Sequence, residues 1–140
     1  MKLNTSKLSY FFFFIGPAGS GKSTLGKKFQ KLKFFKFIEG DNFHSKKNIN
    51  KMINGKKLNF KDRKPWLRKI NKYLLNLKYS SNNYIISCSA LKKKYRNILS
   101  KNLDNCFFIY LKCKKKNLIE RNNNRKHFFP LTLLKDQIDN

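Results

Sequence analysis

Apolar runs of five or six residues alternate along this chain with longer stretches whose apolar residues recur at helical spacing. The first run, 10–15, is uninterrupted and ends at a glycine, which is typical of a strand buried on both faces of a parallel sheet. Further strands are predicted over 34–38, 84–88 and 106–111. Helices are predicted over 22–33, 48–77 with a break around 55–59, 91–101 and 114–125. Pro65 is expected in the first turn of the helix after that break. This alternation predicts an α/β fold with a doubly wound parallel sheet of about four strands.

A glycine-rich loop lies between the first predicted strand and the first predicted helix. Its sequence over 16–23, GPAGSGKS, matches the pattern GxxxxGKS/T in the context that this motif requires. Glycines let the backbone curl so that N–H groups point at phosphates, and the following helix adds the positive end of its dipole. Lys22 is expected to reach the β- and γ-phosphates of ATP, and the hydroxyl of Ser23 to bind Mg²⁺. The predicted ATP-binding residues of this segment are Gly16, Pro17, Ala18, Gly19, Ser20, Gly21, Lys22, Ser23 and Thr24.

A phosphate loop alone does not separate a kinase from a GTPase or an ATPase motor, so the acidic residues matter. Asp41 follows the second predicted strand, at the carboxyl edge of the sheet where such folds bind ligands. There a carboxylate can accept the proton of an attacking hydroxyl, orient that hydroxyl, or hold Mg²⁺ through water. The structural alternative is that Asp41 caps the helix before Asn48. His44, three residues further on, could contact an acceptor or be a surface histidine.

The net charge of +26 would ordinarily indicate a polyanionic partner, nucleic acid or an anionic membrane. However, only five of the 33 basic residues are Arg, and Lys, Asn, Phe and Ile dominate the composition. Lys and Asn at solvated positions with Phe and Ile at apolar ones indicate nucleotide bias in the genome rather than a binding surface. We therefore expect neither nucleic acid nor membrane as a partner.

The length of 140 residues predicts a single domain over 1–140 with one core. The start of the chain superficially resembles a signal peptide, but cleavage there would destroy the phosphate loop. No apolar stretch approaches the roughly 18 residues that a membrane span needs, which predicts a cytoplasmic protein. Cys88, Cys106 and Cys113 have no metal or redox spacing and are expected to be small buried hydrophobes in a reducing compartment.

Four further blocks of the chain carry recognisable motifs: GDNFHSKKNINKMINGKKLNFKDRKPWL, CSALKKKYRNIL, FIYLK and RNNNRKHFFPLTLLKDQ. Together these blocks resemble the bacterial gluconokinase family. The resemblance implies a three-layer fold similar to nucleoside monophosphate kinases, with a helical lid at about 121–130. It further implies ATP- and Mg²⁺-dependent transfer of the γ-phosphoryl group to the 6-hydroxyl of D-gluconate, giving 6-phospho-D-gluconate and ADP. A homodimer is also implied.

The resemblance assigns roles to residues of these blocks. Asp41 would be the base or orienting group, and His44 and Arg63 would meet the hydroxyls and carboxylate of the sugar acid. Lys92 and Arg96 would add positive charge beside Arg63 around the sugar acid. A structural or solvated role remains the alternative for all three residues. The lid arginines Arg121 and Arg125 would close over the phosphates, or could be plain helix-face charges. His127 resembles a lid histidine without an assigned role, and Trp66 could equally be plain core.

Three departures from the family pattern modify this picture. Phe60 stands where the family has an acid, and the lid is one residue short before His127. The chain stops at Asn140, where the family continues into a fifth strand and a last helix. Without those parts we expect an exposed sheet flank and weaker nucleotide affinity.

The alternatives to an active gluconokinase are an inactive remnant of one, a basic P-loop protein that binds nucleic acid, and a kinase of similar fold with shikimate as acceptor.

Overall fold

Four parallel strands form one sheet in the computed structural model, which describes residues 7–124. The order across the sheet is β2-β3-β1-β4. The strands are β1 (Tyr10–Ile15), β2 (Phe35–Glu39), β3 (Asn83–Ser87) and β4 (Asn105–Tyr110). These bounds agree with the predicted strands to within about a residue, and the α/β class and the four-stranded parallel sheet are confirmed.

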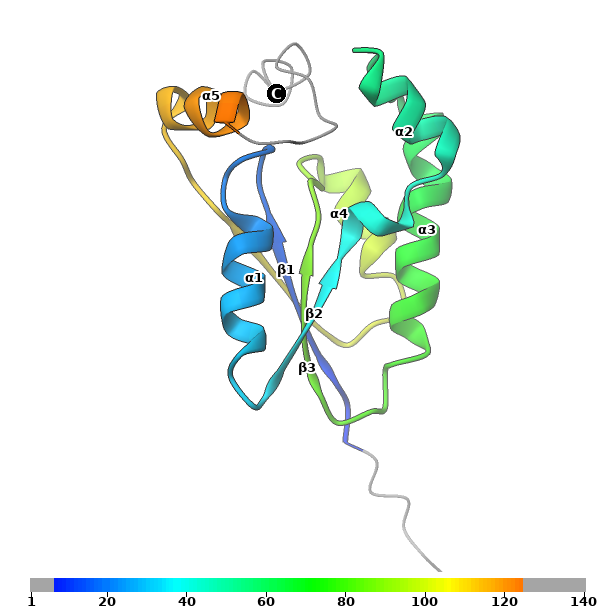
Figure 1. Cartoon of the computed structure of the whole chain (residues 1–140). Coiled ribbons are helices and arrows are strands. Elements are labelled where there is room, and N and C mark those ends of the chain that lie inside the picture. Colours follow the sequence, from blue (N-terminus) through cyan, green and yellow to red (C-terminus); the bar gives the residue numbers. More distant parts are fainter. Residues whose placement is uncertain (1–6, 125–140) are drawn as a thin grey trace, which may run out of the picture.

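Helices cover both faces of this sheet and give three layers (Figure 1). Helix α1 lies on one face, α3 and α4 lie on the other, and α2 and α5 rise on opposite sides above the carboxyl ends of the strands (Figure 1). The helices are α1 (Lys22–Gln30), the short 3₁₀-helix η1 (Gly40–Phe43), α2 (Lys46–Ile53), α3 (Phe60–Leu75), α4 (Lys93–Leu99) and α5 (Lys115–Asn124).

The main core lies between the sheet and α3. Phe11 and Phe13 of β1 are fully buried there, and Leu67 and Ile70 of α3 pack into the same cluster. Alternate residues of β1 thus meet the apolar stripe of α3, as the strand and helix periodicities require. Burying this face of α3 fixes the helix, and with it every side chain that α3 sends toward the carboxyl ends of the strands.

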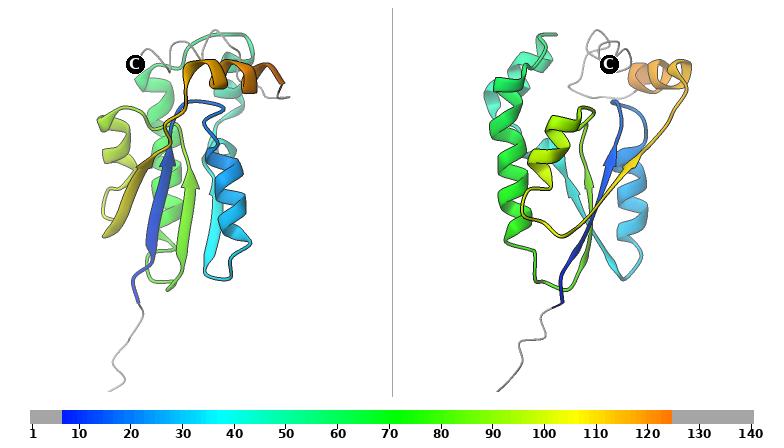
Figure 2. Two further views of the ribbon diagram at one scale, coloured as in Figure 1. Left: turned by 90° about the vertical axis from the view of Figure 1, so that its left-hand side faces the viewer. Right: turned by 180° about the vertical axis from the view of Figure 1, so that it is seen from behind.

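The opposite face of the sheet is only partly covered. The left panel of Figure 2 shows α1 beside β2 and β3, with β1 and β4 open beside it. Tyr10 of β1 is 44 % exposed and Phe107 of β4 is 48 % exposed, and their rings stack at 6.4 Å. The prediction that the first strand is buried on both faces is therefore wrong for its first half, because α1 packs mainly against β2 and β3.

Two helix starts differ from the predictions because local caps set them. Ser45 caps α2 by accepting a hydrogen bond from the backbone N–H of Asn48 at 3.1 Å, so Asp41 is not the cap. Asn59 and Asp62 form a reciprocal capping box that starts α3 at Phe60. Pro65 therefore lies in the second turn of α3 rather than in the first.

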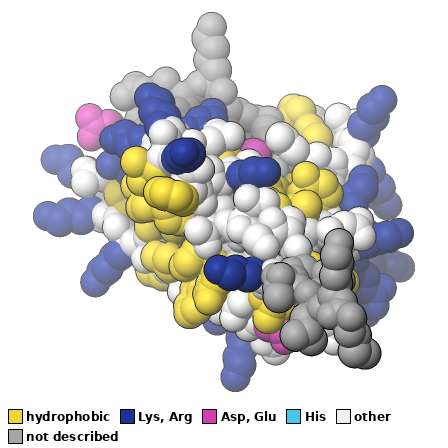
Figure 3. Space-filling view, turned by 90° about the horizontal axis from the view of Figure 1, so that it is seen from below, with side chains coloured by type: hydrophobic (Ala, Val, Ile, Leu, Met, Phe, Trp, Pro, Cys, Tyr) yellow, Lys and Arg dark blue, Asp and Glu magenta, His cyan; other side chains and the backbone are white. Residues whose placement is uncertain are grey.

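The burial of the cysteines and the character of the surface can be compared with the predictions. Cys88 is buried as predicted, whereas Cys106 and Cys113 are half-buried, and all three thiols are free. In Figure 3 the Lys and Arg side chains project on every side of the face that is shown, with hydrophobic side chains between them. Within residues 7–124 no helix has the length and apolar character that a membrane span requires.

Candidate functional site

Polar segments gather where the strands end. The phosphate loop, residues 16–21, leads from β1 into α1, and η1 follows β2 directly. Gly40 lies so close to the carbonyl oxygen of Ser87 at the end of β3 that any larger side chain would collide with it. We call the phosphate loop, α1 and α5 the nucleotide side of the site, and η1, α2 and α3 its acceptor side.

The phosphate loop has the features that an anion requires. Gly21, at the N-terminus of α1, has a φ of 98°, which only glycine adopts readily. The Lys22 ammonium lies over the loop and donates to the carbonyl oxygens of Gly16 and Pro17, at 2.7 and 2.9 Å. The Ser20 hydroxyl is buried and has no hydrogen-bond partner within the described residues. A cation, an unpaired buried hydroxyl and a helix N-terminus together fit a phosphate group.

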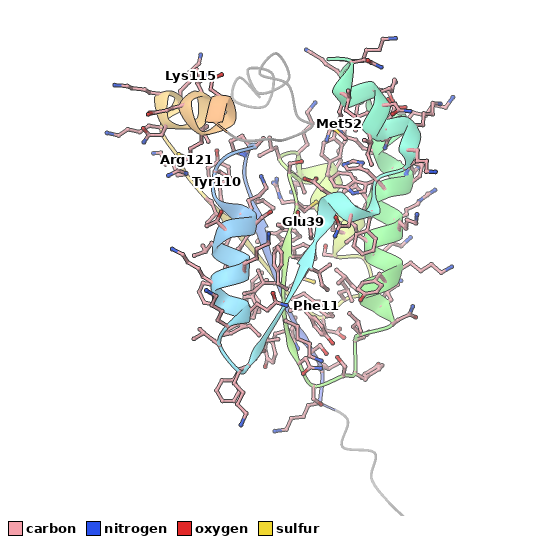
Figure 4. All side chains as sticks on the ribbon, in the orientation of Figure 1. Phe11, Glu39, Met52, Tyr110, Lys115 and Arg121 are labelled. Atoms are coloured by element: carbon pink, nitrogen blue, oxygen red, sulfur yellow. The ribbon has the colours of Figure 1, made fainter. Side chains whose placement is uncertain are left out.

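Glu39 is a functional candidate that the sequence reasoning missed. As the last residue of β2 it pairs in register with Ser87 of β3. One carboxylate oxygen accepts from the Ser23 hydroxyl at 2.5 Å, and the other from the Ser87 hydroxyl at 2.5 Å. Figure 4 shows Glu39 at the upper end of β2. The sequence does contain a signal for Glu39, because it is an acid at the end of a predicted strand. It stands two residues before Asp41, the acid that the sequence analysis assigned to the site.

Four charged side chains act on the buried thiol of Cys88, just past the end of β3. The pKa of Cys88 is raised by burial and by the carboxylates of Asp41 and Glu39, while Lys22 and Arg63 oppose that rise. The structure thus brings Asp41 and Lys22 to the same end of the sheet, together with Glu39 from β2 and Arg63 from α3. Two carboxylates and two cations thus converge from three segments that are far apart in the sequence: the start of α1, residues 39–41 and α3.

His44 lies buried against Trp66 on the acceptor side. The two rings stack at 3.9 Å with an angle of 15° between their planes. Desolvation, with a further contribution from the Arg63 charge, lowers the pKa of His44 to about 3. His44 is therefore neutral near pH 7, and it is not a surface histidine. Trp66 is core, as one alternative proposed, but its indole N–H also donates to the carbonyl oxygen of Gly40 at 2.8 Å.

Helix α2 is tied to the start of α3. The Asn48 side-chain amide donates to the backbone carbonyl of Asp62 at 3.0 Å, and Lys51 forms an ion pair with the Asp62 carboxylate at 2.7 Å. The hydrogen bond from Lys51 is the main reason that the pKa of Asp62 is lowered. These bonds hold α2, which follows directly after His44, in one place.

The remaining acceptor-side cations differ in what holds them. Arg63 donates to the carbonyl oxygen of Leu58 at 3.2 Å and lies 5.5 Å from the ring centre of Tyr95. Arg96 donates to the backbone carbonyls of Ala90 and Leu91, at 3.1 and 2.7 Å. It thereby braces the loop after β3, in agreement with the structural alternative. Lys92 is exposed at the N-cap position of α4.

A cleft of about 1130 Å³ opens on the nucleotide side between α1, the end of β4 and α5. Its walls include Gly19 and Thr24 from the loop and α1, Tyr110 from β4, and Arg121 from α5. Arg121 donates to the carbonyl oxygen of Gly19 at 3.1 Å, so this predicted lid arginine reaches the phosphate loop (Figure 4). The other predicted lid residues, Arg125 and His127, lie outside the described residues.

Comparisons with known proteins agree with this geometry. The family model described as "Shikimate kinase" matches residues 18–139. The thermosensitive gluconokinase of Escherichia coli (strain K12) is 40% identical over 129 residues, which cover 91% of this chain and 69% of that protein. A sugar kinase from Janibacter sp. HTCC2649 superimposes with a TM-score of 0.86 at 32% identity, covering 94% of this chain and 76% of the other. A gluconokinase from Sinorhizobium meliloti 1021 superimposes with a TM-score of 0.78 at 36% identity, covering 93% and 73%.

Proposed function

The chain belongs to the gluconokinases within the shikimate kinase-like P-loop family, and we propose that it uses Mg²⁺ and ATP to phosphorylate the 6-hydroxyl of D-gluconate. It is an ATP-dependent kinase, a phosphotransferase with an alcohol as acceptor. The products would be 6-phospho-D-gluconate and ADP. The convergence of Asp41 and Glu39 after β2 with Lys22 after β1, at the same end of the sheet, carries the proposal, because these are the charge types that phosphoryl transfer requires.

Asp41 is the residue that we assign to the acceptor hydroxyl. A new bond forms between that hydroxyl oxygen and the γ-phosphorus, the bond from that phosphorus to the ADP oxygen breaks, and Asp41 takes the hydroxyl proton. Its place on η1 supports this role, because η1 begins directly at the end of β2, at the same end of the parallel sheet as the phosphate loop that follows β1. The same carboxylate can aim the hydroxyl before the proton leaves.

Ser23 and Glu39 form the proposed metal site. A serine hydroxyl and a carboxylate are hard oxygen donors, and these two are already within 2.5 Å of each other. When bound, Mg²⁺ would neutralise charge on the phosphates. Ser87 holds the far oxygen of Glu39, so the near oxygen stays directed at Ser23. Within residues 7–124 no group of three or more His, Cys, Asp or Glu could hold a metal by itself, so substrate phosphates and water would supply the remaining ligands.

The phosphates would be held by the loop amides of 16–23, Thr24, Lys22 and Arg121. Lys22 and Arg121 now donate to carbonyl oxygens of the loop, and their charges can turn to phosphate oxygens that bind there. Arg121 would neutralise charge that develops during transfer, and Arg125 would assist it. The cleft beside Tyr110 is large enough for a nucleoside.

The acceptor side would recognise a sugar acid. Arg63 supplies a planar cation suited to a carboxylate, and neutral His44 offers a hydrogen bond to hydroxyls. Lys92 and Arg96 would add positive charge around the acceptor. A cytoplasmic location, a homodimer and the absence of nucleic-acid or membrane partners remain predictions.

The test compares Asp41→Asn with the wild-type protein in an assay that couples ADP release to gluconate, with shikimate as a second acceptor. We expect kcat to fall by about 10²- to 10⁴-fold, because an amide cannot accept the proton. Asp104→Asn is the matched control, since Asp104 is an exposed acid paired with Lys78 at the far end of the sheet. Full activity of Asp41→Asn would contradict the assigned base, and turnover of shikimate alone would favour the shikimate alternative.

Two further measurements address the remaining alternatives. A competent protein should gain about 2.7 kcal/mol of stability from a ligand at 100 times its dissociation constant, and an inactive remnant should not. Binding to nucleic acid that falls steeply with salt and survives Asp41→Asn would favour the nucleic-acid alternative instead.

A further inference from the structure

We propose that Trp66 is a positioning residue, whose indole fixes both ends of the segment 40–44 and thereby sets the places of Asp41 and His44 together. The inference rests on the proposed function, in which Asp41 and His44 face the acceptor. Trp66 is the only tryptophan of the chain. It is 2 % exposed and lies on α3, which the main core holds in place.

The first contact is made at the start of the segment. The indole N–H of Trp66 donates to the carbonyl oxygen of Gly40 at 2.8 Å, in a buried position. Gly40 packs directly on the backbone of Ser87 at its other side. The peptide unit that joins Gly40 to Asp41 is therefore held between β3 and the indole. Losing the donor would leave a buried carbonyl without this bond and free the peptide to rotate.

The second contact is made at the end of the segment. The face of the indole stacks on the His44 ring at 3.9 Å. The backbone N–H of His44 donates to the carbonyl oxygen of Asp41 at 3.2 Å, which closes the turn. One side chain thus contacts Gly40, directly before Asp41, and His44, three residues after it, which restricts the turn between them.

The same arrangement selects the tautomer of His44. The Asn48 side-chain nitrogen lies 3.4 Å from Nδ1 of His44, and an amide nitrogen can only donate. Nδ1 must therefore be the acceptor, and the ring proton is on Nε2. With one face covered by Trp66 and Nδ1 turned to α2, the Nε2–H remains as the donor for a hydroxyl oxygen of the acceptor.

The test removes the N–H while keeping the ring. Because the chain has one tryptophan, growth on the analogue 3-benzothienylalanine, which has sulfur in place of the N–H, changes this position alone. Trp66→Phe is the second variant. We expect kcat with gluconate to fall at least 10-fold in both, since small displacements of a reacting group cost one to two orders of magnitude. The KM for Mg-ATP should change less than 2-fold, because the nucleotide side is built from other segments.

Ile70→Val is the control for loss of packing, since Ile70 lies one turn further along α3 in the same core. It should lower the melting temperature and leave kcat within 2-fold. The positioning role is wrong if both Trp66 variants keep kcat within 2-fold of the wild type. It is also wrong if Ile70→Val lowers kcat by as large a factor as the Trp66 variants do.

A second measurement is independent of turnover. In the analogue-labelled protein and in Trp66→Phe, hydrogen exchange at the His44 amide should become at least 10-fold faster, while that of Leu25 in α1 stays the same. Unchanged exchange at His44 would overturn the positioning role. If exchange at His44 becomes faster in the variants but the wild-type protein itself does not turn over gluconate, the positioning role is upheld and the proposed function is contradicted.

Discussion

The two sides of the site satisfy their polar groups in different ways. On the nucleotide side, Lys22 and Arg121 donate to carbonyl oxygens of the loop that they serve. On the acceptor side, Trp66 bonds to Gly40, and Lys51 bonds to Asp62, so that helices are joined to each other and to the sheet. The first set of contacts can be exchanged for contacts to a ligand, whereas the second is part of the folded framework.

Because of this difference, substitutions on the two sides should affect activity and stability to different extents. On the nucleotide side, the phosphates of a ligand can replace the loop carbonyl oxygens as hydrogen-bond acceptors for Lys22 and Arg121. On the acceptor side, a change that exposes or unpairs a buried group acts on folding, because such groups are costly to leave unsatisfied. Substitutions should therefore affect activity with little loss of stability on the nucleotide side, and stability together with activity on the acceptor side.

The largest effect should come from Lys22→Ala. Removing this cation should lower kcat/KM by on the order of 10³-fold, as for other charges directed at a developing anion. The melting temperature should stay close to the wild-type value, because the loop carbonyls of Gly16 and Pro17, to which Lys22 donates, can accept hydrogen bonds from water instead. Lys27→Ala, an exposed lysine of the same helix, is the control. A large drop in melting temperature for Lys22→Ala would break the comparison between the two sides.

The fold was accessible from the sequence because strands and helices follow local patterns. The run 10–15 and the glycine-rich loop predicted β1, the start of α1 and the phosphate site between them. Exposure was less accessible, because it depends on which strands α1 covers. Tyr10 and Phe107 look like core residues in the sequence, yet each is more than 40 % exposed.

Within the site, the residues that sequence reasoning missed are those whose partners are remote. Glu39 bonds to Ser23 and Ser87, which are 16 and 48 positions away. The register of β2 and β3 brings Ser87 to it, and the packing of α1 on β2 brings Ser23. The Trp66 bond to Gly40 spans 26 positions. Asp41, in contrast, was found from its place after a strand, because the carboxyl edge of such a sheet is a general binding place.

A second, smaller effect is expected from Glu39→Gln. The amide keeps the shape but loses the charge, so the Mg²⁺ concentration for half-maximal activity should rise about 10- to 100-fold. Ser87→Ala should raise it less, since it removes only the hydrogen bond that orients Glu39. Both are measured by titrating Mg²⁺ at fixed ATP and gluconate, with Asp104→Asn as the acid-to-amide control. An unchanged Mg²⁺ requirement in Glu39→Gln would remove Glu39 from the metal site and leave it as a strand-end contact.

The smallest effect probes the acceptor side through stability. The pKa of His44 is about 3 in the folded protein and near 6.5 when unfolded. Below pH 6.5 the unfolded chain therefore binds a proton at His44 that the folded protein does not. The contribution of His44 to the free energy of unfolding is thus complete above pH 6.5 and decreases as the pH falls toward 3. Between pH 7 and pH 5 this amounts to about 2 kcal/mol, measured by urea unfolding at each pH.

His44→Gln should remove most of this loss, because the glutamine does not titrate. Aspartates and glutamates with ordinary pKa values change little between pH 7 and pH 5, so histidine dominates this window. The control is His127→Gln, the chain's other histidine, which should keep the wild-type slope. If the slope instead followed His127, or persisted in His44→Gln, burial of a neutral His44 against Trp66 would not contribute to folding. The acceptor side would then be as exchangeable as the nucleotide side, and the contrast between them would disappear.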